Sequence, residues 1–409
     1  MIETKFKDTE VGRIPEDWEV KSIGSLTDNC SYGVGAEACL YRGGIKYIRI
    51  TDIDDETHRY MPSPATSPSF YQEKHIVQEN DLLVARTGAS VGKSYLYDKN
   101  DGMLVYAGFL MKLNVINANP KYVFYNTLTK AYMNWVIRES ARTVQPGLNL
   151  QQMKSYSIPL PPLSEQTRIA TVLSNIDALI SELGRLIEKK RAIKQGAMQQ
   201  LLTGKKRLKG FSEPWVEKKL GEICEFQNGY TPSKAVNSFW ESGTIPWFRM
   251  EDIRTNGRIL SDAIQHITEE AVKGNLFPAN SIIMSTTATI GEHALLIVDS
   301  LANQGFTNLT IRKSLTQAVD VMWFYHYCFI LGEWCRMNIN EGVLAAVNKE
   351  DFSKVMIPIP SLKEQSAIAS VLSSMDNEIS ALEAKKAKYE QIKQGMMQQL
   401  LTGKIRLVD

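Results

Sequence analysis

The sequence predicts an α+β protein in which two globular domains are separated by two long helices, packed as an antiparallel coiled coil with pseudo-twofold symmetry. The first observation is a repeat, because residues 158–208 recur at 357–407 with roughly 30 of about 51 positions identical and no gap. The second is that the segments flanking each copy repeat more loosely. The third is a stripe of apolar residues at helical spacing in both copies. The period is as long as a domain, which excludes a solenoid of small units.

Residues 1–157 are predicted to form the first domain and residues 209–356 the second, each a mixture of strands and helices. In both halves, short strand-like runs alternate with Gly, Asn, Asp and Pro, and a stretch with apolar residues at helical spacing follows them. The runs lie at 46–51, 82–85 and 109–116 and near Trp247 and Ile282, and the helical stretches span 120–141 and 318–337. We align 83–92 with 282–291. A common scaffold with different polar loops indicates two related but different targets.

The repeated segments, 158–208 and 357–409, are each predicted to form one long helical region. Apolar residues recur at alternating spacings of three and four, which is typical of a coiled coil. They are Ile169, Val172, Leu173, Ile176, Ile180, Leu183, Ile187 and Ile193 in the first copy, and Ile368, Val371, Leu372, Met375, Ile379, Leu382 and Ile392 in the second. A helix of about 38 residues is roughly 57 Å long. Because so long a stripe cannot stay in water, we expect the helices to pack against each other; the alternative is that each packs on its own domain.

The ends of the two helices carry their own signals. Ser361 followed by Glu364 predicts a capping box, and Gly204 and Gly403 stand where a left-handed residue would end each helix. If the chain ends mimic the internal junction at 205–213, the tail at 404–409 should lie near the N-terminal segment.

Composition limits the class of protein. With 409 residues, 44% apolar and 22% charged, the chain is long enough for two or three domains. No apolar run reaches about 18 residues and the first residues lack a signal peptide's apolar core, so we expect a cytoplasmic protein with no membrane partner. The five cysteines show no CxxC spacing, which supports neither a disulfide framework nor a zinc site. The net charge of +2 is low for a nucleic-acid-binding protein, which indicates local basic patches or a partner that completes the cationic surface.

Three segments resemble motifs of catalysis or ligand binding but depart from them. Residues 88–94 have three residues between their glycines where a phosphate-binding loop has four. Residues 119–122, Asn-Pro-Lys-Tyr, lack the second proline of the tetrapeptide with which adenine and cytosine methyltransferases hold a flipped base. The acidic run at 52–56 has only Glu251 and Asp252 as its counterpart. We therefore predict no catalytic and no metal-binding residues in this chain.

Motifs at both ends of each half resemble those of a known family. Residues 14–20 read Ile-Pro-Glu-Asp-Trp-Glu-Val, Ile-Pro-x-Pro-x-Leu-x-Glu-Gln opens both helical regions at 158–166 and 357–365, and Gln-Gln-Leu-Leu-Thr-Gly-Lys closes them at 199–205 and 398–404. In this duplicated order the motifs resemble type I restriction-modification specificity (S) subunits, over essentially the whole chain.

The resemblance implies that each globular part is a target recognition domain that reads one half of a bipartite, asymmetric DNA site. The helical regions would set the spacing of the half-sites and dock two modification subunits. In that family, the modification subunits bind S-adenosylmethionine and methylate adenine, and a restriction subunit, where present, uses ATP and Mg for translocation and cleavage. The resemblance thus implies that this chain is not an enzyme, binds no cofactor itself, and has as partners double-stranded DNA, two modification subunits and the restriction subunits.

DNA contacts are expected in the turns between matched strands, where the halves diverge. In the major groove, Arg can pair with guanine, and Asn or Gln with adenine. The candidates are Tyr32, Lys46, Arg86, Thr87, Lys93, Ser94, Gln145 and Asn149 in the first domain, and Tyr230, Thr231, Lys234, Thr286, Thr287 and Asn348 in the second. Arg49 and Arg249 occupy equivalent positions, which favours a shared structural or phosphate-binding role.

Two other functions stay open on the residues alone. A coiled-coil adaptor that never contacts nucleic acid would explain the low net charge. A self-sufficient nuclease or methyltransferase is disfavoured by the missing motifs.

Overall fold

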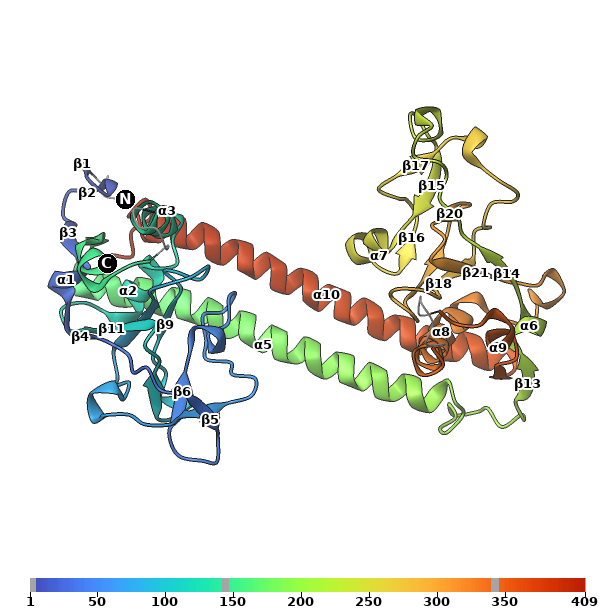
Figure 1. Cartoon of the computed structure of the whole chain (residues 1–409), viewed down its shortest axis with the longest axis horizontal. Coiled ribbons are helices and arrows are strands. Elements are labelled where there is room, and N and C mark those ends of the chain that lie inside the picture. Colours follow the sequence, from blue (N-terminus) through green and yellow to red (C-terminus); the bar gives the residue numbers. More distant parts are fainter. Residues whose placement is uncertain (1–4, 142–146, 340–345, 409) are drawn as a thin grey trace. The chain divides into compact units, whose positions relative to one another are not determined.

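The computed structural model describes residues 5–141, 147–339 and 346–408. The chain forms two compact units: unit 1 is Met1–Gly184 with Ala384–Asp409, and unit 2 is Arg185–Glu383. The division passes through both long helices, so each unit contains one globular part and half of each helix (Figure 1). The four segments predicted from the sequence divide the chain differently, because packing joins helix halves that are distant in the sequence.

Unit 1 is built on a four-stranded antiparallel sheet in the order β4-β11-β8-β9. Every residue of β8 is buried, because the sheet has a core on each face. The strands are β1 (Phe6–Thr9), β2 (Gly12–Pro15), β3 (Glu19–Ser22), β4 (Thr27–Tyr32), β5 (Ala38–Leu40), β6 (Lys46–Ile48), β7 (Thr66–Pro68), β8 (Asp81–Ala85), β9 (Ser94–Leu96), β10 (Leu104–Tyr106), β11 (Leu110–Val115) and β12 (Ser157–Leu160). The α-helices are α1 (Ile23–Leu26), α2 (Pro120–Asn126), α3 (Lys130–Ser140) and α4 (Leu150–Ser155), with parts of α5 (Leu163–Leu201) and α10 (Leu362–Leu400).

Unit 2 repeats this plan with a five-stranded sheet in the order β14-β21-β18-β19-β16, whose last strand is parallel to its neighbour. The strands are β13 (Val216–Lys219), β14 (Cys224–Asn228), β15 (Ile245–Phe248), β16 (Ile259–Leu260), β17 (His266–Ile267), β18 (Ser281–Ser285), β19 (His293–Leu296), β20 (Leu301–Ala302), β21 (Phe306–Ile311) and β22 (Met356–Ile359). The α-helices are α6 (Leu220–Ile223), α7 (Met250–Asn256), α8 (Val321–Met337) and α9 (Lys349–Ser353), with the other parts of α5 and α10.

The strand register corrects one alignment made from the sequence. Leu82 pairs with Leu96 across β8 and β9, and Ile282 pairs with Leu295 across β18 and β19. Leu82 and Ile282 also lie in the cores that contain the long helices. Ile282 is therefore the counterpart of Leu82 and not of Leu83. The extra residue of the first copy is taken up in the turn between the two strands.

Helices α5 and α10 are each 39 residues long, about 58 Å at 1.5 Å per residue. In each unit, the first half of one helix lies antiparallel to the second half of the other (Figure 1). An ion pair joins Asp177 of α5 to Lys393 of α10 in unit 1, with 2.7 Å between Oδ1 and Nζ, and Asp376 joins Lys194 in unit 2. Among the described residues, no helix has both the length and the apolar character needed to cross a membrane.

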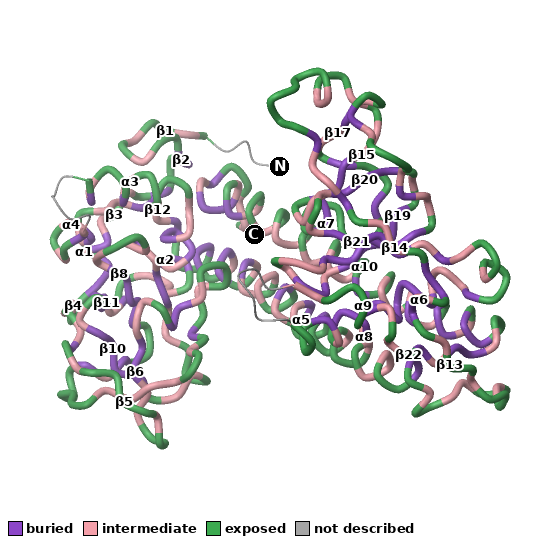
Figure 2. The backbone as a smooth tube through the Cα atoms, turned by 45° about the vertical axis from the view of Figure 1, so that its right-hand side comes forward, coloured by how far each residue is buried: buried purple, intermediate pink, exposed green. Residues whose placement is uncertain are grey.

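The apolar stripe is buried where both helices and a sheet meet. In unit 1, Ile169 and Leu173 of α5 share one core with Met397 and Leu400 of α10 and with the sheet. Figure 2 marks the buried parts of the chain in purple. The predicted helix pairing is confirmed, and the alternative of packing only on each helix's own domain is wrong. The stripe is shorter than predicted, because Ile193 and Ile392 are 47% and 37% exposed.

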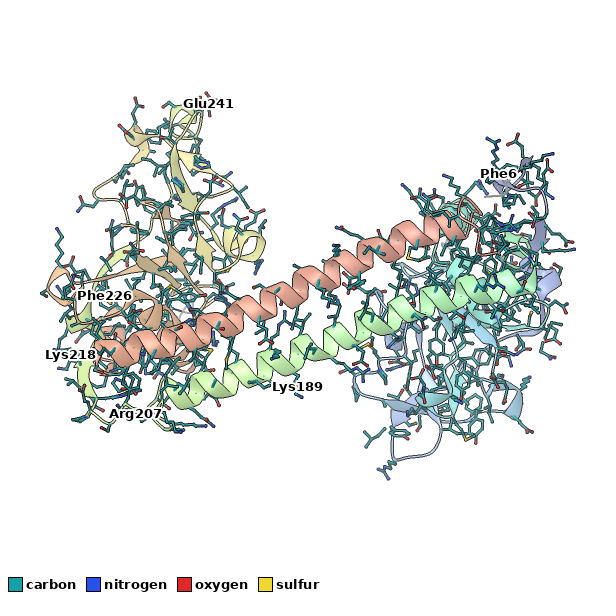
Figure 3. All side chains as sticks on the ribbon, turned by 180° about the vertical axis from the view of Figure 1, so that it is seen from behind. Phe6, Lys189, Arg207, Lys218, Phe226 and Glu241 are labelled. Atoms are coloured by element: carbon teal, nitrogen blue, oxygen red, sulfur yellow. The ribbon has the colours of Figure 1, made fainter. Side chains whose placement is uncertain are left out.

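The helix ends are locked by the same contacts in both units. In unit 2, Arg207 binds both oxygens of Glu364 at 2.5 and 2.6 Å and lies over Trp215, whose Nε1 donates to Glu364 at 3.0 Å (Figure 3). Glu364 therefore does not serve the predicted capping box with Ser361. The left-handed Gly204 passes the face of Trp215, where a Cβ would lie 3.3 Å from the ring.

In unit 1, the chain ends form the corresponding lock. Arg406 binds Glu165 at 2.8 and 2.9 Å and lies over Trp18, whose Nε1 donates to Glu165 at 3.1 Å. Arg406 also binds Asp17, and these carboxylates raise the pKa of its guanidinium. The expectation that the C-terminal tail lies near the N-terminal segment is confirmed.

Two histidines are buried where the sheet of unit 2 meets helix α8. The His326 Nε2 lies 3.0 Å from the Ser373 hydroxyl of α10, and the His293 ring packs edge-on against Phe329 at 4.4 Å. Burial lowers the pKa of both imidazoles to about 3. Both are therefore neutral in the folded protein near pH 7. In unit 1, Tyr125 fills the place of His326 and contacts Ser174 and Asp177.

We expect acid to destabilise unit 2 through this pair. Between pH 3 and 6.5 the unfolded chain binds protons that the folded chain excludes, so stability falls as the pH drops below 6.5. At pH 5.5, each buried histidine should lower the free energy of unfolding by about 1.4 kcal/mol relative to its value at pH 7.5. The measurement is urea unfolding at both pH values. The drop in unfolding free energy from pH 7.5 to pH 5.5 should be smaller by about 1.4 kcal/mol in His326→Gln than in the parent protein. An equal pH dependence in the parent protein and in His326→Gln would contradict the expectation.

Candidate nucleic-acid interface

Four of the predicted residues in unit 1 meet where strands β4 and β8 end. The Arg86 guanidinium lies over the Tyr32 ring, with 4.4 Å between its Cζ and the ring centroid. The Tyr32 hydroxyl accepts a hydrogen bond from the Leu150 backbone at 3.0 Å, and Thr87 forms a bridge with Gly147. Asn149 begins helix α4 beside them. We call Tyr32, Arg86, Thr87 and Asn149 the unit 1 strand-end cluster.

Arg86 has hydrogen-bonding capacity left over. Its Nε is buried and has no partner among the described residues. The side chain is half-buried, and the aromatic ring that supports it is 37% exposed. A guanidinium held by stacking keeps a fixed plane while its outer N–H groups can donate. The cluster can therefore present a planar donor fork to an acceptor pair outside the protein.

The equivalent place in unit 2 carries neutral hydrogen-bonding groups. The Thr286 and Thr307 hydroxyl oxygens lie 3.2 Å apart, and Thr307 Oγ1 lies 3.5 Å from Asn228 Oδ1. Thr287 forms a bridge with Ala346, as Thr87 does with Gly147. We call Asn228, Thr286, Thr287, Thr307 and Asn348 the unit 2 strand-end cluster. The two clusters share their backbone pattern and differ in chemistry.

Two glycines fix this correspondence. A Cβ on Gly33 would lie 2.2 Å from the Ala107 carbonyl oxygen, and a Cβ on Gly229 would lie 2.1 Å from that of Asn303. Neither position tolerates a side chain, because backbone atoms occupy its space. The residues before them, Tyr32 and Asn228, are therefore equivalent. Asn228 and Thr307 were missed from the sequence, and aligning these glycines would have found Asn228.

The two asparagines that precede short helices have a local role. The Asn149 side chain accepts a hydrogen bond from the Gln152 backbone at 2.9 Å. Asn348 accepts from the backbones of Glu350 and Asp351 at 2.8 and 3.3 Å. Both are N-caps, which satisfy amides at the start of a helix. Both residues are at least half-exposed, so capping does not bury them.

Three candidates in unit 1 lie outside the cluster and are held by other parts of the domain. Lys46 donates to the Asp101 carbonyl oxygen at 2.7 Å, and Lys93 pairs with Asp55 at 2.6 Å. Ser94 is fully buried and its hydroxyl lies 2.7 Å from that of Thr127. A DNA contact by Ser94 does not fit this structure, because strand β9 turns the side chain into the core. Gln145 lies outside the described residues.

The remaining candidates in unit 2 also lie apart from the cluster. The Tyr230 hydroxyl donates to the Ala271 carbonyl oxygen at 2.7 Å, which ties it to a loop rather than to a free surface. Thr231 bonds to Gln304. Lys234 is exposed and lines a cavity of about 310 Å³ with Trp240 and Gln265. The strand register makes Asn228, and not Tyr230, the residue equivalent to Tyr32.

Acidic residues near the equivalent arginines have structural partners. Arg49 binds both oxygens of the buried Asp52 at 2.8 Å, which favours the structural role over a phosphate contact. Asp252 accepts from the backbones of Arg249 and Ile264, both at 2.7 Å. Among the described residues, no three His, Cys, Asp or Glu side chains gather as a metal site.

Comparison with known proteins identifies the family. The model of the type I restriction modification DNA specificity domain matches twice, over residues 15–194 and 212–394, so each match covers one globular part and most of the helix after it. The chain belongs to this family. It is thereby a DNA sequence-specificity subunit of a type I restriction-modification system, and the adaptor interpretation is not favoured.

Relatives agree with the family match. The EcoprrI specificity subunit of Escherichia coli is 46% identical over 183 residues, which cover 43% of this chain and only 45% of that relative. The putative MjaX specificity subunit of Methanocaldococcus jannaschii is 26% identical over 424 residues, covering 99% and 97%. The crystal structure of the S subunit from M. genitalium has a TM-score of 0.59 at 17% identity, covering 94% and 96%, which supports the fold.

Proposed function

We propose that unit 1 and unit 2 each read one half of a bipartite, asymmetric DNA site, and that the strand-end clusters make sequence-determining contacts. The observation that carries this proposal is the pair of clusters, which lie on equivalent strand ends and differ in chemistry. Two equivalent positions with unlike donors and acceptors are what an asymmetric site requires. A symmetric site would instead favour the same residues in both units.

In this proposal, Arg86 is the main reader of the first half-site. Arginine pairs with the O6 and N7 acceptors of guanine through two N–H groups, and a pre-oriented fork loses little freedom on binding. Tyr32 supplies that orientation by lying under the guanidinium. The neutral cluster of unit 2 suits bases that need amide or hydroxyl partners, such as adenine.

The proposal includes partners, because the chain has a net charge of only +2 and phosphate binding normally needs a larger cationic surface. Two modification subunits would dock on the helical regions and complete the clamp around DNA, and restriction subunits would join where present. S-adenosylmethionine would be bound by the modification subunit, and ATP with Mg by the restriction subunit. This chain would then be non-catalytic and act in the cytoplasm.

Arg86→Gln should change which base is accepted at one position of one half-site. A good bidentate pair is worth about 1–3 kcal/mol of discrimination, so the preference for guanine should fall at least about fivefold. The measurement is methylation of a library with each half-site randomised in turn, using the complex reconstituted with its modification subunit.

Lys99→Gln is the matched control, because it removes the same charge from an exposed residue. It should leave the base preference unchanged. A uniform loss of methylation across all sequences in Arg86→Gln would contradict the reading role, since that is the signature of a phosphate contact.

The continuous helices are the proposed ruler for the spacer between the half-sites. Seven residues inserted after both Gly184 and Glu383 would keep the apolar stripe in phase and lengthen each helix by about 10.5 Å. The required spacer should then grow by about three base pairs at 3.4 Å each. The measurement is methylation of sites whose spacers differ in length.

The same seven residues placed beside the exposed Gly210 serve as the control, because they leave both helices intact. That variant should keep the original spacer. If the doubly lengthened protein also kept it, the helices would not be the ruler.

A further inference from the structure

Ion pairs between α5 and α10 are of two kinds, and the first is reciprocal. The two helices correspond residue by residue from Leu163 and Leu362. Lys194 pairs with Asp376 in unit 2, and the corresponding Lys393 pairs with Asp177 in unit 1. Since both helices carry both partners, these pairs would form equally well if α5 met a second copy of α5.

The second kind is one-sided. In unit 2, Lys190 pairs with Glu378 and Arg191 with Glu383, each with 2.6 Å between nitrogen and oxygen. The corresponding residues of unit 1 are of types that form no ion pair with each other. By position they are Tyr389 with Leu179, and Glu390 with Gly184. Glu390 pairs with Lys386 of its own helix at 3.0 Å.

The one-sided pairs separate the correct pairing from its alternatives. If α5 paired with a second α5, Lys190 and Arg191 would face leucine and glycine. If α10 paired with a second α10, Glu383 would face Glu390, a contact between like charges. Arg191 also pairs with Glu188 of its own helix at 2.7 Å, but only α5 against α10 forms the pairs with Glu378 and Glu383.

The locks at the helix ends provide no such discrimination. Arg207 binds Glu364 in unit 2, and Arg406 binds Glu165 in unit 1. Both locks have an arginine, a glutamate and a tryptophan, so either arginine could engage either glutamate. The locks therefore give no preference between like and unlike pairing.

We propose that these one-sided ion pairs make α5 selective for α10 and keep either helix from pairing with its own copy in another molecule. The face of α5 that carries Lys190 and Arg191 therefore fits one partner, which is helix α10. The side chains are 33–54% exposed, so each pair contributes modestly. When two molecules exchange halves, two α5–α10 pairs become one α5–α5 pair and one α10–α10 pair, and four one-sided ion pairs are lost. We therefore expect the equilibrium constant of this exchange to favour the α5–α10 pairs at least about tenfold over random pairing.

The test uses the whole folded chain, cut once. A specific protease site is placed at Gly210, an exposed left-handed residue in the loop between Arg207 and Trp215. The cut protein is mixed with an isotopically labelled copy, and native mass spectrometry counts unlike and like pairs of halves once label has exchanged. The exchange constant, which is the squared abundance of unlike pairs divided by the product of the two like-pair abundances, should exceed its statistical value at least about tenfold. A statistical distribution would overturn the proposal.

Charge variants assign the effect to these residues. Glu378→Lys with Glu383→Lys places like charges opposite Lys190 and Arg191, and should lower that exchange constant, in favour of like pairs, at least about tenfold. Adding Lys190→Glu with Arg191→Glu should restore the unlike pairs, which shows that the charges and not misfolding are responsible.

Asp376→Asn is the matched control, because it weakens a reciprocal pair and therefore affects like and unlike pairings equally. It should leave their ratio unchanged. An unchanged ratio in the double lysine variant, or an equal shift in Asp376→Asn, would overturn the proposal. Every readout is an association state, so the result is independent of whether the protein reads DNA.

Discussion

The whole structure depends on covering the apolar stripes of two 39-residue helices. A stripe of that length cannot remain in water. Each unit therefore takes the first half of one helix and the second half of the other, and builds its core from both and from a sheet. The consequence is that unit 1 is completed by a distant stretch of chain, residues 384–409, while unit 2 is the stretch between its two pieces, residues 185–383.

This arrangement explains how one scaffold can carry two different readers. The sheets, the long helices and the locks around Trp18 and Trp215 recur in both units, because they serve packing. The strand ends serve no packing role that demands one residue type, so Tyr32 and Arg86 can stand where the other unit has Asn228 and Thr286. Stability and recognition are thus assigned to different residues, which lets either reader change without disturbing the helix pair.

The parts that could be predicted from the sequence rest on periodicity and on the repeat. The helix pair and the glycine at the end of each helix follow from spacing alone, and the chain-end lock follows from the internal junction. The site was predicted less well, because exposure depends on packing that spacing does not reveal. Ser94 was expected on the surface and is buried beside Thr127, and Asn228 was missed because its place depends on strand register. Glu364 was expected to cap its own helix and instead binds Arg207.

Native-state hydrogen exchange tests most directly the claim that helix halves distant in the sequence form one cooperative unit. Amides of α5 before residue 184 and of α10 after residue 384 should open together, with the same free energy and the same denaturant dependence. The remaining halves should open together as a second group. The account would be contradicted if α5 opened along its whole length as one block while α10 stayed protected.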